Sequence, residues 1–304
     1  MTLQSVLNGI SGILVTPFDG DDRLAPARLQ PVIDRALAAG LHIPVVNGNT
    51  GEFYALTVDE AETMCAEVVG MVAGRAPVLA GVGRSVKDAC RLAGSAARAG
   101  AAGLMVHQPP DPFVAPRGVV EYVRRIADAG DGLPLMLYLR NDAIGTRAIA
   151  DLCAIPGVIG VKWATPNPLK LAEAIAACDP GIIWVGGLAE VWAPALYAVG
   201  ARGFTSGLIN IWPERSLAIH AALEGGDYVK ARSLIADMAA FEEIRAEEMN
   251  GTNVTGVKAA LAAMGQDCGP TRPPAAWPLT ATQQARMQDF LTSQGLLAAE
   301  LATG

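Results

Sequence analysis

Eight short apolar runs alternate along the chain with longer amphipathic segments, and this alternation restricts the possible folds more than any other feature. The apolar runs fall at residues 12–16, 42–47, 77–81, 103–107, 134–139, 158–162, 182–186 and 203–206. The amphipathic segments fall at 26–39, 57–73, 85–99, 116–129, 146–153, 168–178, 189–199 and 212–224, and many are rich in alanine, which favours helix. Such alternation predicts parallel strands joined by crossover helices. Eight units over about 250 residues are typical of a closed (β/α)8 TIM barrel, which is the fold we predict.

A doubly wound open sheet is the alternative arrangement of βα units. It predicts fewer strands and a glycine fingerprint that opens the first helix. The first unit here ends in residues 16–22, Thr-Pro-Phe-Asp-Gly-Asp-Asp, which carry no such fingerprint. We therefore favour the closed barrel.

The last quarter of the chain has a different pattern, with helical segments and no strand-like runs. Segments 228–249, 254–264 and 280–299 fit helices, and a Pro/Gly-rich loop at 268–274 separates the last two. We expect the barrel to occupy residues 1–225 and a C-terminal helical extension to occupy residues 226–304.

Composition excludes several classes of protein. The net charge is −7 and no Lys/Arg run occurs, which argues against a nucleic-acid partner. No apolar run reaches the roughly 18–20 residues that span a bilayer, and residues 1–11 lack the positive charge of a signal peptide. The five cysteines are far apart, without zinc-ligand spacing. We expect a cytoplasmic protein that binds a small molecule, without a membrane, a metal site or a cofactor.

Lys162 ends the apolar run 158–162. Burying an unpaired ammonium is costly, so a lysine at this position needs a reason. A desolvated lysine has a lowered pKa and can attack a carbonyl to form a Schiff base. The alternative is a strand-end lysine whose charged head reaches solvent. The other lysines lie in polar or helix-like contexts, and they are Lys87, Lys170, Lys230 and Lys258.

The residues that follow the second strand-like run could bind an anion. Active sites of such barrels lie at the C-terminal ends of the strands. Asn49, Thr50 and Gly51 lie in a loop that could present backbone N–H groups and side-chain donors to a carboxylate. An ordinary turn whose glycines supply positive φ explains the same residues.

Other strand ends carry further candidates. Tyr138 could pass protons beside Lys162, and Arg140 could clamp a carboxylate with two hydrogen bonds. Thr205 or Ser206 could hydrogen-bond a ligand. His107 is the one histidine of three placed to reach the site. The alternatives are a core tyrosine, a surface arginine, small residues in a tight turn and a structural histidine.

These residues resemble the signature of a known family. The run 48–52 (Gly-Asn-Thr-Gly-Glu), then Tyr138, then the run 160–162 (Gly-Val-Lys) are similar to the dihydrodipicolinate synthase/N-acetylneuraminate lyase superfamily. The resemblance covers residues 9 to about 278. It implies a (β/α)8 barrel with a helical extension, assembly as a homotetramer, and a lyase that acts on a 2-oxo acid. It also implies that Lys162 forms the Schiff base and Tyr138 relays protons.

The resemblance further implies that Asn49 and Thr50 hold the 2-oxo acid carboxylate. Two departures argue against dihydrodipicolinate synthesis. Ala143 stands where the synthase branch has an arginine that grips the amino-acid aldehyde, and Pro109 and Pro110 replace a tyrosine lent across a dimer interface.

Other runs are similar to 5-dehydro-4-deoxyglucarate dehydratases. They are 51–56 (Gly-Glu-Phe-Tyr-Ala-Leu), 138–140 (Tyr-Leu-Arg) and 186–188 (Gly-Gly-Leu). Leu139, Trp163 and Ala164 depart from that group. We expect Arg140 to select a substrate with a distal carboxylate or a polyhydroxyl tail, because the tail must point away from the carboxylate loop.

The motifs therefore favour a 2-oxo-deoxy sugar-acid dehydratase or aldolase. One alternative is a 4-hydroxy-tetrahydrodipicolinate synthase, which joins pyruvate to aspartate semialdehyde. A second alternative is a non-catalytic regulator that binds 2-oxo acids. The presence of both Lys162 and Tyr138 counts against the second alternative.

Overall fold

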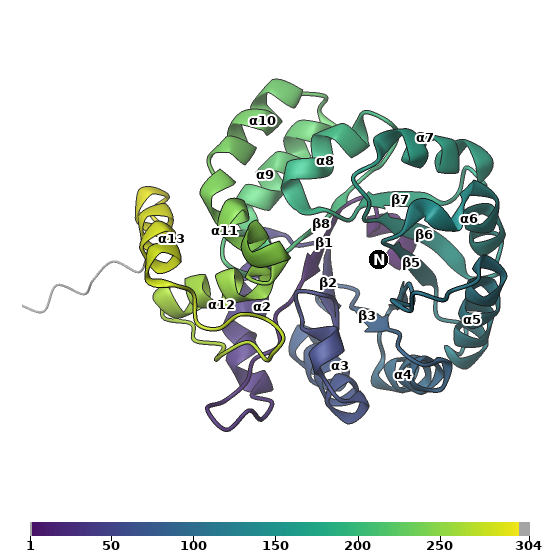
Figure 1. Cartoon of the computed structure of the whole chain (residues 1–304), viewed down its shortest axis with the longest axis horizontal. Helices are drawn as coiled ribbons and strands as arrows, with labels where there is room; N and C mark the ends of the chain where they lie inside the picture. The colour runs from purple at the N-terminus through teal and green to yellow at the C-terminus, as the bar shows by residue number, and fades with distance from the viewer. Residues whose placement is uncertain (1, 298–304) are drawn as a thin grey trace, which may run out of the picture.

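The protein is a barrel of eight parallel strands (Figure 1). The structure is a computed structural model that describes residues 2–297. The strands pair in the order β1 to β8, and β8 pairs with β1 to close the sheet. The strands are β1 (Ile10–Ile13), β2 (Ile43–Val46), β3 (Leu79–Val82), β4 (Gly103–His107), β5 (Leu135–Leu139), β6 (Val158–Trp163), β7 (Ile183–Gly186) and β8 (Phe204–Ser206). All eight lie within or overlap the predicted apolar runs, so the predicted barrel is confirmed.

Helices surround the barrel (Figure 1). They are α2 (Gln30–Ala39), α3 (Val58–Val72), α4 (Val86–Ala99), α5 (Pro116–Ala129), α6 (Thr146–Cys153), α7 (Pro168–Ala177), α8 (Ala189–Tyr197) and α9 (Pro213–Glu224). A short helix, α1 (Leu3–Val6), precedes β1. Short 3-10 segments complete the loops as η1 (Pro26–Leu29), η2 (Phe53–Ala55), η3 (Asp142–Ile144) and η4 (Leu208–Asn210).

Local capping chemistry sets the ends of these helices. Thr57 and Glu60 form a reciprocal capping box at the start of α3. Ser85 caps α4 by accepting a hydrogen bond from the backbone N–H of Asp88. Gly100 ends α4 with a φ of 86°, a left-handed conformation that glycine adopts without steric cost.

The C-terminal helices are α10 (Tyr228–Ala236), α11 (Ala239–Asn250), α12 (Asn253–Ala263) and α13 (Ala281–Ser293). The prediction of one helix over 228–249 is wrong, because α10 and α11 are separate. The backbone of α11 also leaves helical geometry at Glu247–Met249. The helix expected over 280–299 ends at Ser293, and residues 298–299 lie outside the described residues. The division at residue 225 stays a prediction.

Side chains of the strands alternate between the barrel interior and the surrounding helices. The interior cluster is apolar and includes Ile13, Ile43, Val45, Leu79, Met105, Met136 and Val185. The register pairs Tyr138 with His107 on one side and with Lys162 on the other. Because partners in a parallel sheet share a face, these three side chains all point inward at the C-terminal end of the barrel.

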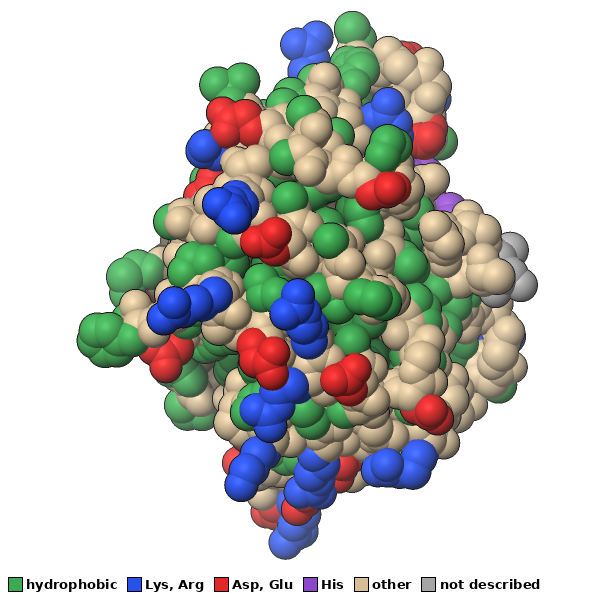
Figure 2. All heavy atoms as spheres, turned by 90° about the vertical axis from the view of Figure 1, so that its right-hand side faces the viewer, with side chains coloured by type: hydrophobic (Ala, Val, Ile, Leu, Met, Phe, Trp, Pro, Cys, Tyr) green, Lys and Arg blue, Asp and Glu red, His purple; other side chains and the backbone are tan. Residues whose placement is uncertain are grey.

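The outer surface carries charges of both signs. Figure 2 shows the side of the molecule where α5 and α6 lie in Figure 1, and there Lys and Arg side chains are interspersed with Asp, Glu and hydrophobic side chains. None of the helices within residues 2–297 is long and apolar enough to cross a bilayer.

Two glycine substitutions should change stability in opposite directions. Gly203 has a φ of +77°, and a Cβ there would lie 2.3 Å from the carbonyl oxygen of Gly9. We expect Gly203→Ala to lower the free energy of unfolding by more than about 2 kcal/mol, because it combines backbone strain with overlap. Gly70→Ala on α3 should raise the free energy of unfolding by about 0.5–1 kcal/mol, because alanine loses less backbone entropy than glycine in a helix. The added Cβ would meet nothing within 4 Å. Urea unfolding measures both changes, and a Gly203→Ala protein as stable as wild type would contradict the first.

Candidate active site

A cavity of about 590 Å³ opens at the C-terminal end of the barrel. Five of the residues selected from the sequence line it, namely Asn49, Thr50, Tyr138, Lys162 and Thr205. They come from the ends of four different strands, β2, β5, β6 and β8. The barrel therefore gathers into one cavity residues that lie up to about 150 positions apart in the chain.

Lys162 lies at the base of this cavity and is 3% exposed. Its ammonium does not reach bulk solvent, which excludes the solvent-directed alternative. The Nζ atom lies 3.9 Å from the centre of the Tyr138 ring, and none of the ion pairs of the described residues includes Lys162. Burial and the nearby positive charge of Arg140 lower the pKa of Lys162 to about 7. In a large fraction of the protein molecules, the Lys162 side chain is therefore an uncharged amine near neutral pH.

Tyr138 is held by an amide. The Nδ2 atom of Asn49 donates a hydrogen bond of 2.9 Å to the Tyr138 hydroxyl oxygen. The Oδ1 atom of Asn49 is buried and has no hydrogen-bond partner among the described residues. Burial raises the pKa of Tyr138 to about 12, although Arg140 opposes the shift. The phenol therefore keeps its proton and can donate it to a group beside Lys162.

The loop after β2 has a defined conformation. The carbonyl of Gly51 accepts a hydrogen bond of 2.7 Å from the Thr16 hydroxyl, and the N–H of Gly51 donates to the carbonyl of Gly48 at 3.0 Å. No hydrogen bond between described residues uses the backbone N–H of Asn49 or Thr50. Asn49 and Thr50 line the cavity, whereas Gly51 lies behind them and shapes the turn. Two backbone donors thus remain free beside the cavity.

Arg140 lies at the boundary between two cavities. Its guanidinium carbon is 5.7 Å from the centre of the Tyr138 ring and 5.5 Å from that of Tyr54. It lines a neighbouring cavity of about 530 Å³ rather than the wall around Lys162. None of the ion pairs of the described residues includes Arg140, so it pairs with neither Asp142 nor Glu52. Its positive charge is available to a bound anion.

Like Gly51 and Arg140, two further expected binding residues do not line the cavity around Lys162. His107 is buried, its Nε2 atom lies 3.0 Å from the carbonyl oxygen of Asn47, and its ring stacks on Phe53. Burial lowers the pKa of His107 to about 3, so the ring is uncharged and supports Tyr138 from behind. Ser206 points toward the helices, where its hydroxyl lies 3.0 Å from that of Ser216. Neither His107 nor Ser206 lines the cavity around Lys162, so their contact with substrate stays a prediction.

The C-terminal helices supply a wall of the cavity that sequence reasoning did not anticipate. The wall residues from α11 and α12 are Glu242, Arg245, Ala246, Asn250, Asn253 and Val254. Arg245 is paired with Glu242, and its Nη2 atom donates to Asn253 Oδ1 at 3.0 Å. The sequence offered no local signal for this wall, because the interruption within α11 and the packing of α12 decide which residues face the barrel.

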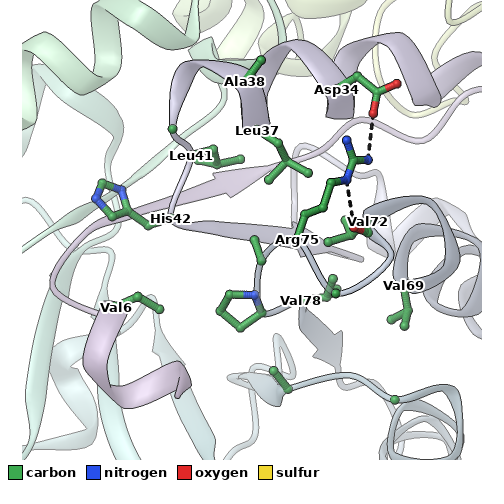
Figure 3. Close-up of a pocket in the computed structure, with 16 residues that line it drawn as sticks. Val6, Asp34, Leu37, Ala38, Leu41, His42, Val69, Val72, Arg75 and Val78 are labelled. Atoms are coloured by element: carbon green, nitrogen blue, oxygen red, sulfur yellow. Dashed lines mark hydrogen bonds and ion pairs between the residues drawn. The ribbon is translucent and has the colours of Figure 1, made fainter. Parts of the chain in front are cut away.

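A second cavity of about 680 Å³ lies at the opposite end of the barrel (Figure 3). It borders the starts of β2 and β3, and its wall is mostly apolar. Figure 3 shows Arg75 extended across it toward Asp34, with which it forms an ion pair of 2.7 Å. Its lining includes His42 but no lysine or tyrosine among the described residues. Lys162 and Tyr138, the pair expected to perform carbonyl chemistry, both line the cavity at the other end of the barrel.

Comparison with known proteins gives a family. The model of the dihydrodipicolinate synthetase family matches residues 6–294. The 4-hydroxy-tetrahydrodipicolinate synthase 1 of Streptomyces coelicolor is 34% identical over 292 residues, covering 94% of this chain and 90% of the relative. The chain therefore belongs to the dihydrodipicolinate synthetase family.

A relative with a different name is equally similar. The probable 5-dehydro-4-deoxyglucarate dehydratase 2 of Streptomyces coelicolor is also 34% identical over 292 residues, with coverage of 94% and 90%. Among solved structures, dihydrodipicolinate synthase from Bacillus clausii has a TM-score of 0.92 and 34% identity, and the match covers 97% of this chain and 100% of that one. These similarities define the family and the fold without separating the two activities.

The lowered pKa of Lys162 predicts a pH profile. At subsaturating pyruvate, the rate of adduct formation in the presence of cyanoborohydride should rise as the pH increases through about 7 and then level off. The rise occurs because only the unprotonated amine attacks a carbonyl. Arg140→Ala should move the midpoint upward, because the variant lacks a neighbouring positive charge. A rate that keeps rising toward about pH 10, the ordinary pKa of lysine, would contradict this prediction.

Proposed function

We propose that this protein is a lyase that acts on a 2-oxo acid through a Schiff base at Lys162. The observation that carries the proposal is a buried lysine that pairs with no carboxylate in the part of the chain that the structure describes. It lies beside a protonated tyrosine at the C-terminal end of a TIM barrel. Such a lysine is a nucleophile near neutral pH, whereas an exposed lysine is almost fully protonated there.

The chemistry begins with addition of the Lys162 amine to the 2-oxo carbon. Loss of water from the carbinolamine gives an imine, whose protonated nitrogen acidifies the C–H bonds of C3, the carbon next to the former 2-oxo carbon. Loss of a proton from C3 then gives an enamine. Tyr138 is placed to give a proton to the departing oxygen and to take one back, because its hydroxyl accepts a hydrogen bond from Asn49 and keeps its own proton.

The substrate carboxylate is proposed to bind at the loop after β2. The free N–H groups of Asn49 and Thr50 and the Thr50 hydroxyl are the donors in this part of the cavity. Thr205 lines the wall contributed by β8 and can hydrogen-bond the substrate from there. With the carboxylate held at the loop and the 2-oxo carbon at Lys162, the rest of the substrate extends across the mouth toward Arg140.

The unpaired guanidinium of Arg140 supports a substrate with a distal carboxylate or polyhydroxyl tail. We therefore propose a 2-oxo-deoxy sugar-acid dehydratase or aldolase, similar to the relatives named 5-dehydro-4-deoxyglucarate dehydratase. The competing function is the 4-hydroxy-tetrahydrodipicolinate synthase named for other relatives. Ala143, which stands where the synthase branch has an arginine, favours the first function. Assembly as a tetramer and a cytoplasmic location stay expectations of the family resemblance.

Reductive trapping tests the Schiff base. Borohydride reduction in the presence of pyruvate, followed by peptide mapping, should place the adduct on Lys162. Lys162→Arg should abolish trapping, because a guanidinium stays charged and forms no imine. The matched change at an exposed lysine, Lys87→Arg, should leave trapping intact. An adduct on a different lysine, or none with any 2-oxo acid, would favour the non-catalytic regulator.

Steady-state kinetics of Arg140→Ala tests the substrate class. We expect turnover of 2-oxo-3-deoxy or 5-dehydro-4-deoxy sugar acids to fall by roughly 10–150-fold, the equivalent of a lost charge-assisted contact, while pyruvate is still trapped at a pH above the shifted midpoint. Arg117→Ala, at an exposed arginine of α5, is the matched control and should change neither measurement. If wild type condenses pyruvate with aspartate semialdehyde and none of the sugar acids reacts, the dehydratase or aldolase assignment is wrong.

A further inference from the structure

A second lysine is buried next to the loop after β2. Lys258 lies on α12, and its side chain has no exposed surface. Its Nζ atom is 2.5 Å from Glu52 Oε1 and donates a hydrogen bond of 2.8 Å to the carbonyl of Pro270. The ammonium also lies 4.4 Å from the centre of the Phe18 ring. Lys258 is therefore fixed by a carboxylate, a carbonyl and an aromatic face.

Both oxygens of the Glu52 carboxylate contact the C-terminal part of the chain, Oε1 through the ion pair with Lys258. Its second oxygen, Oε2, accepts a hydrogen bond of 2.8 Å from the backbone N–H of Arg272. The backbone of Glu52 has a φ of +56°, a left-handed conformation that residues other than glycine rarely adopt. Such a conformation persists only where the surroundings hold it in place. Here the two contacts to the carboxylate supply that restraint.

The backbone of Glu52 continues directly into the residues that face Lys162. The N–H of Glu52 donates to the carbonyl of Asn49 at 3.0 Å, so the two ends of this short turn move together. Thr50 lies inside the turn and, like Asn49, has a backbone N–H free of partners among the described residues. A displacement of the Glu52 carboxylate would thus displace the donors proposed to bind the substrate carboxylate.

A purely stabilising role accounts less well for this arrangement. A buried ion pair contributes little net stability compared with apolar residues of similar volume, because desolvation offsets the attraction. What it does specify is geometry. The attachment of the segment around Arg272 does not depend on it, because Arg272 also pairs with Glu60 at 2.7 Å and with Asp22 at 2.6 Å.

We infer that the Lys258–Glu52 ion pair positions the loop of Asn49 and Thr50 for binding of the 2-oxo acid carboxylate, which makes Lys258 and Glu52 positioning residues supplied from opposite ends of the chain. The inference rests on the proposed function and adds the C-terminal extension to substrate recognition. The Lys258–Glu52 ion pair affects binding of the substrate carboxylate and leaves Lys162 on β6 in place.

The test compares two carbonyl compounds that differ in a carboxylate. Pyruvate and acetaldehyde can both be trapped on Lys162 by cyanoborohydride, but only pyruvate needs the loop. In the double variant Glu52→Gln/Lys258→Met, which removes both charges together, the half-saturating pyruvate concentration should rise about tenfold or more. The maximal trapping rate and the trapping of acetaldehyde should stay within about twofold of wild type, because Lys162 is not displaced.

Two further variants separate positioning from a general loss of stability. Glu52→Asp keeps both charges but shortens the side chain, and it should raise the half-saturating pyruvate concentration in the same direction by a smaller factor. Ile126→Ala creates a cavity under α5, away from the loop, and should leave that concentration unchanged at temperatures where it is folded.

The outcomes distinguish the inference from the proposed function. Two results would overturn the positioning role while the Schiff base stands. One is a half-saturating pyruvate concentration that is unchanged in Glu52→Asp and in the double variant. The other is an equal loss of trapping for pyruvate and for acetaldehyde. If wild type forms no adduct at Lys162 with either compound, the proposed function fails and the positioning role falls with it.

Discussion

The desolvation of Lys162 is the constraint on which the rest of the site depends. A buried ammonium without a counter-charge is unfavourable, and here the nearby guanidinium of Arg140 adds to that cost. The barrel accommodates the buried Lys162 because a side chain must fill the inner face of β6 and because the amine can lose its proton. The same desolvation keeps Tyr138 protonated. The lowered pKa of Lys162 and the raised pKa of Tyr138 therefore arise from one cause, the burial of both side chains at the end of the barrel.

The two buried lysines differ in the groups that face them, and we assign them different roles for that reason. Lys162 and Lys258 have the same side chain and are both almost fully buried. Lys258 faces Glu52 at 2.5 Å, so it keeps a counter-charge and is suited to hold a loop. Lys162 faces an aromatic ring and, within residues 2–297, pairs with no carboxylate, so it is suited to attack a carbonyl. The C-terminal helices link the two roles, since α12 carries Lys258 and also lines the cavity.

The barrel could be predicted from sequence because its signal is local and repeated: each apolar run and each helical segment is readable by itself. Lys162, Tyr138, Asn49 and Thr50 could be placed together because strand ends in a closed barrel converge. The sequence could not tell which of Thr205 and Ser206 points into the cavity, because that depends on the strand register. Lys258 was read as an ordinary helical lysine, since its partner lies about 200 residues away in the chain. The wall from α11 depends on an interruption of that helix which no local pattern predicted.

Hydrogen exchange at the substrate tests the central claim most directly, because enamine formation precedes dehydration, aldol cleavage and condensation alike. In deuterium oxide, wild-type protein should exchange the methyl protons of pyruvate for deuterium, as followed by the loss of the methyl signal in proton NMR. Lys162→Met should show no exchange above the buffer rate while remaining folded. Exchange that persists undiminished in Lys162→Met, or wild-type protein that exchanges neither pyruvate nor 2-oxobutanoate, would contradict a Schiff base at Lys162.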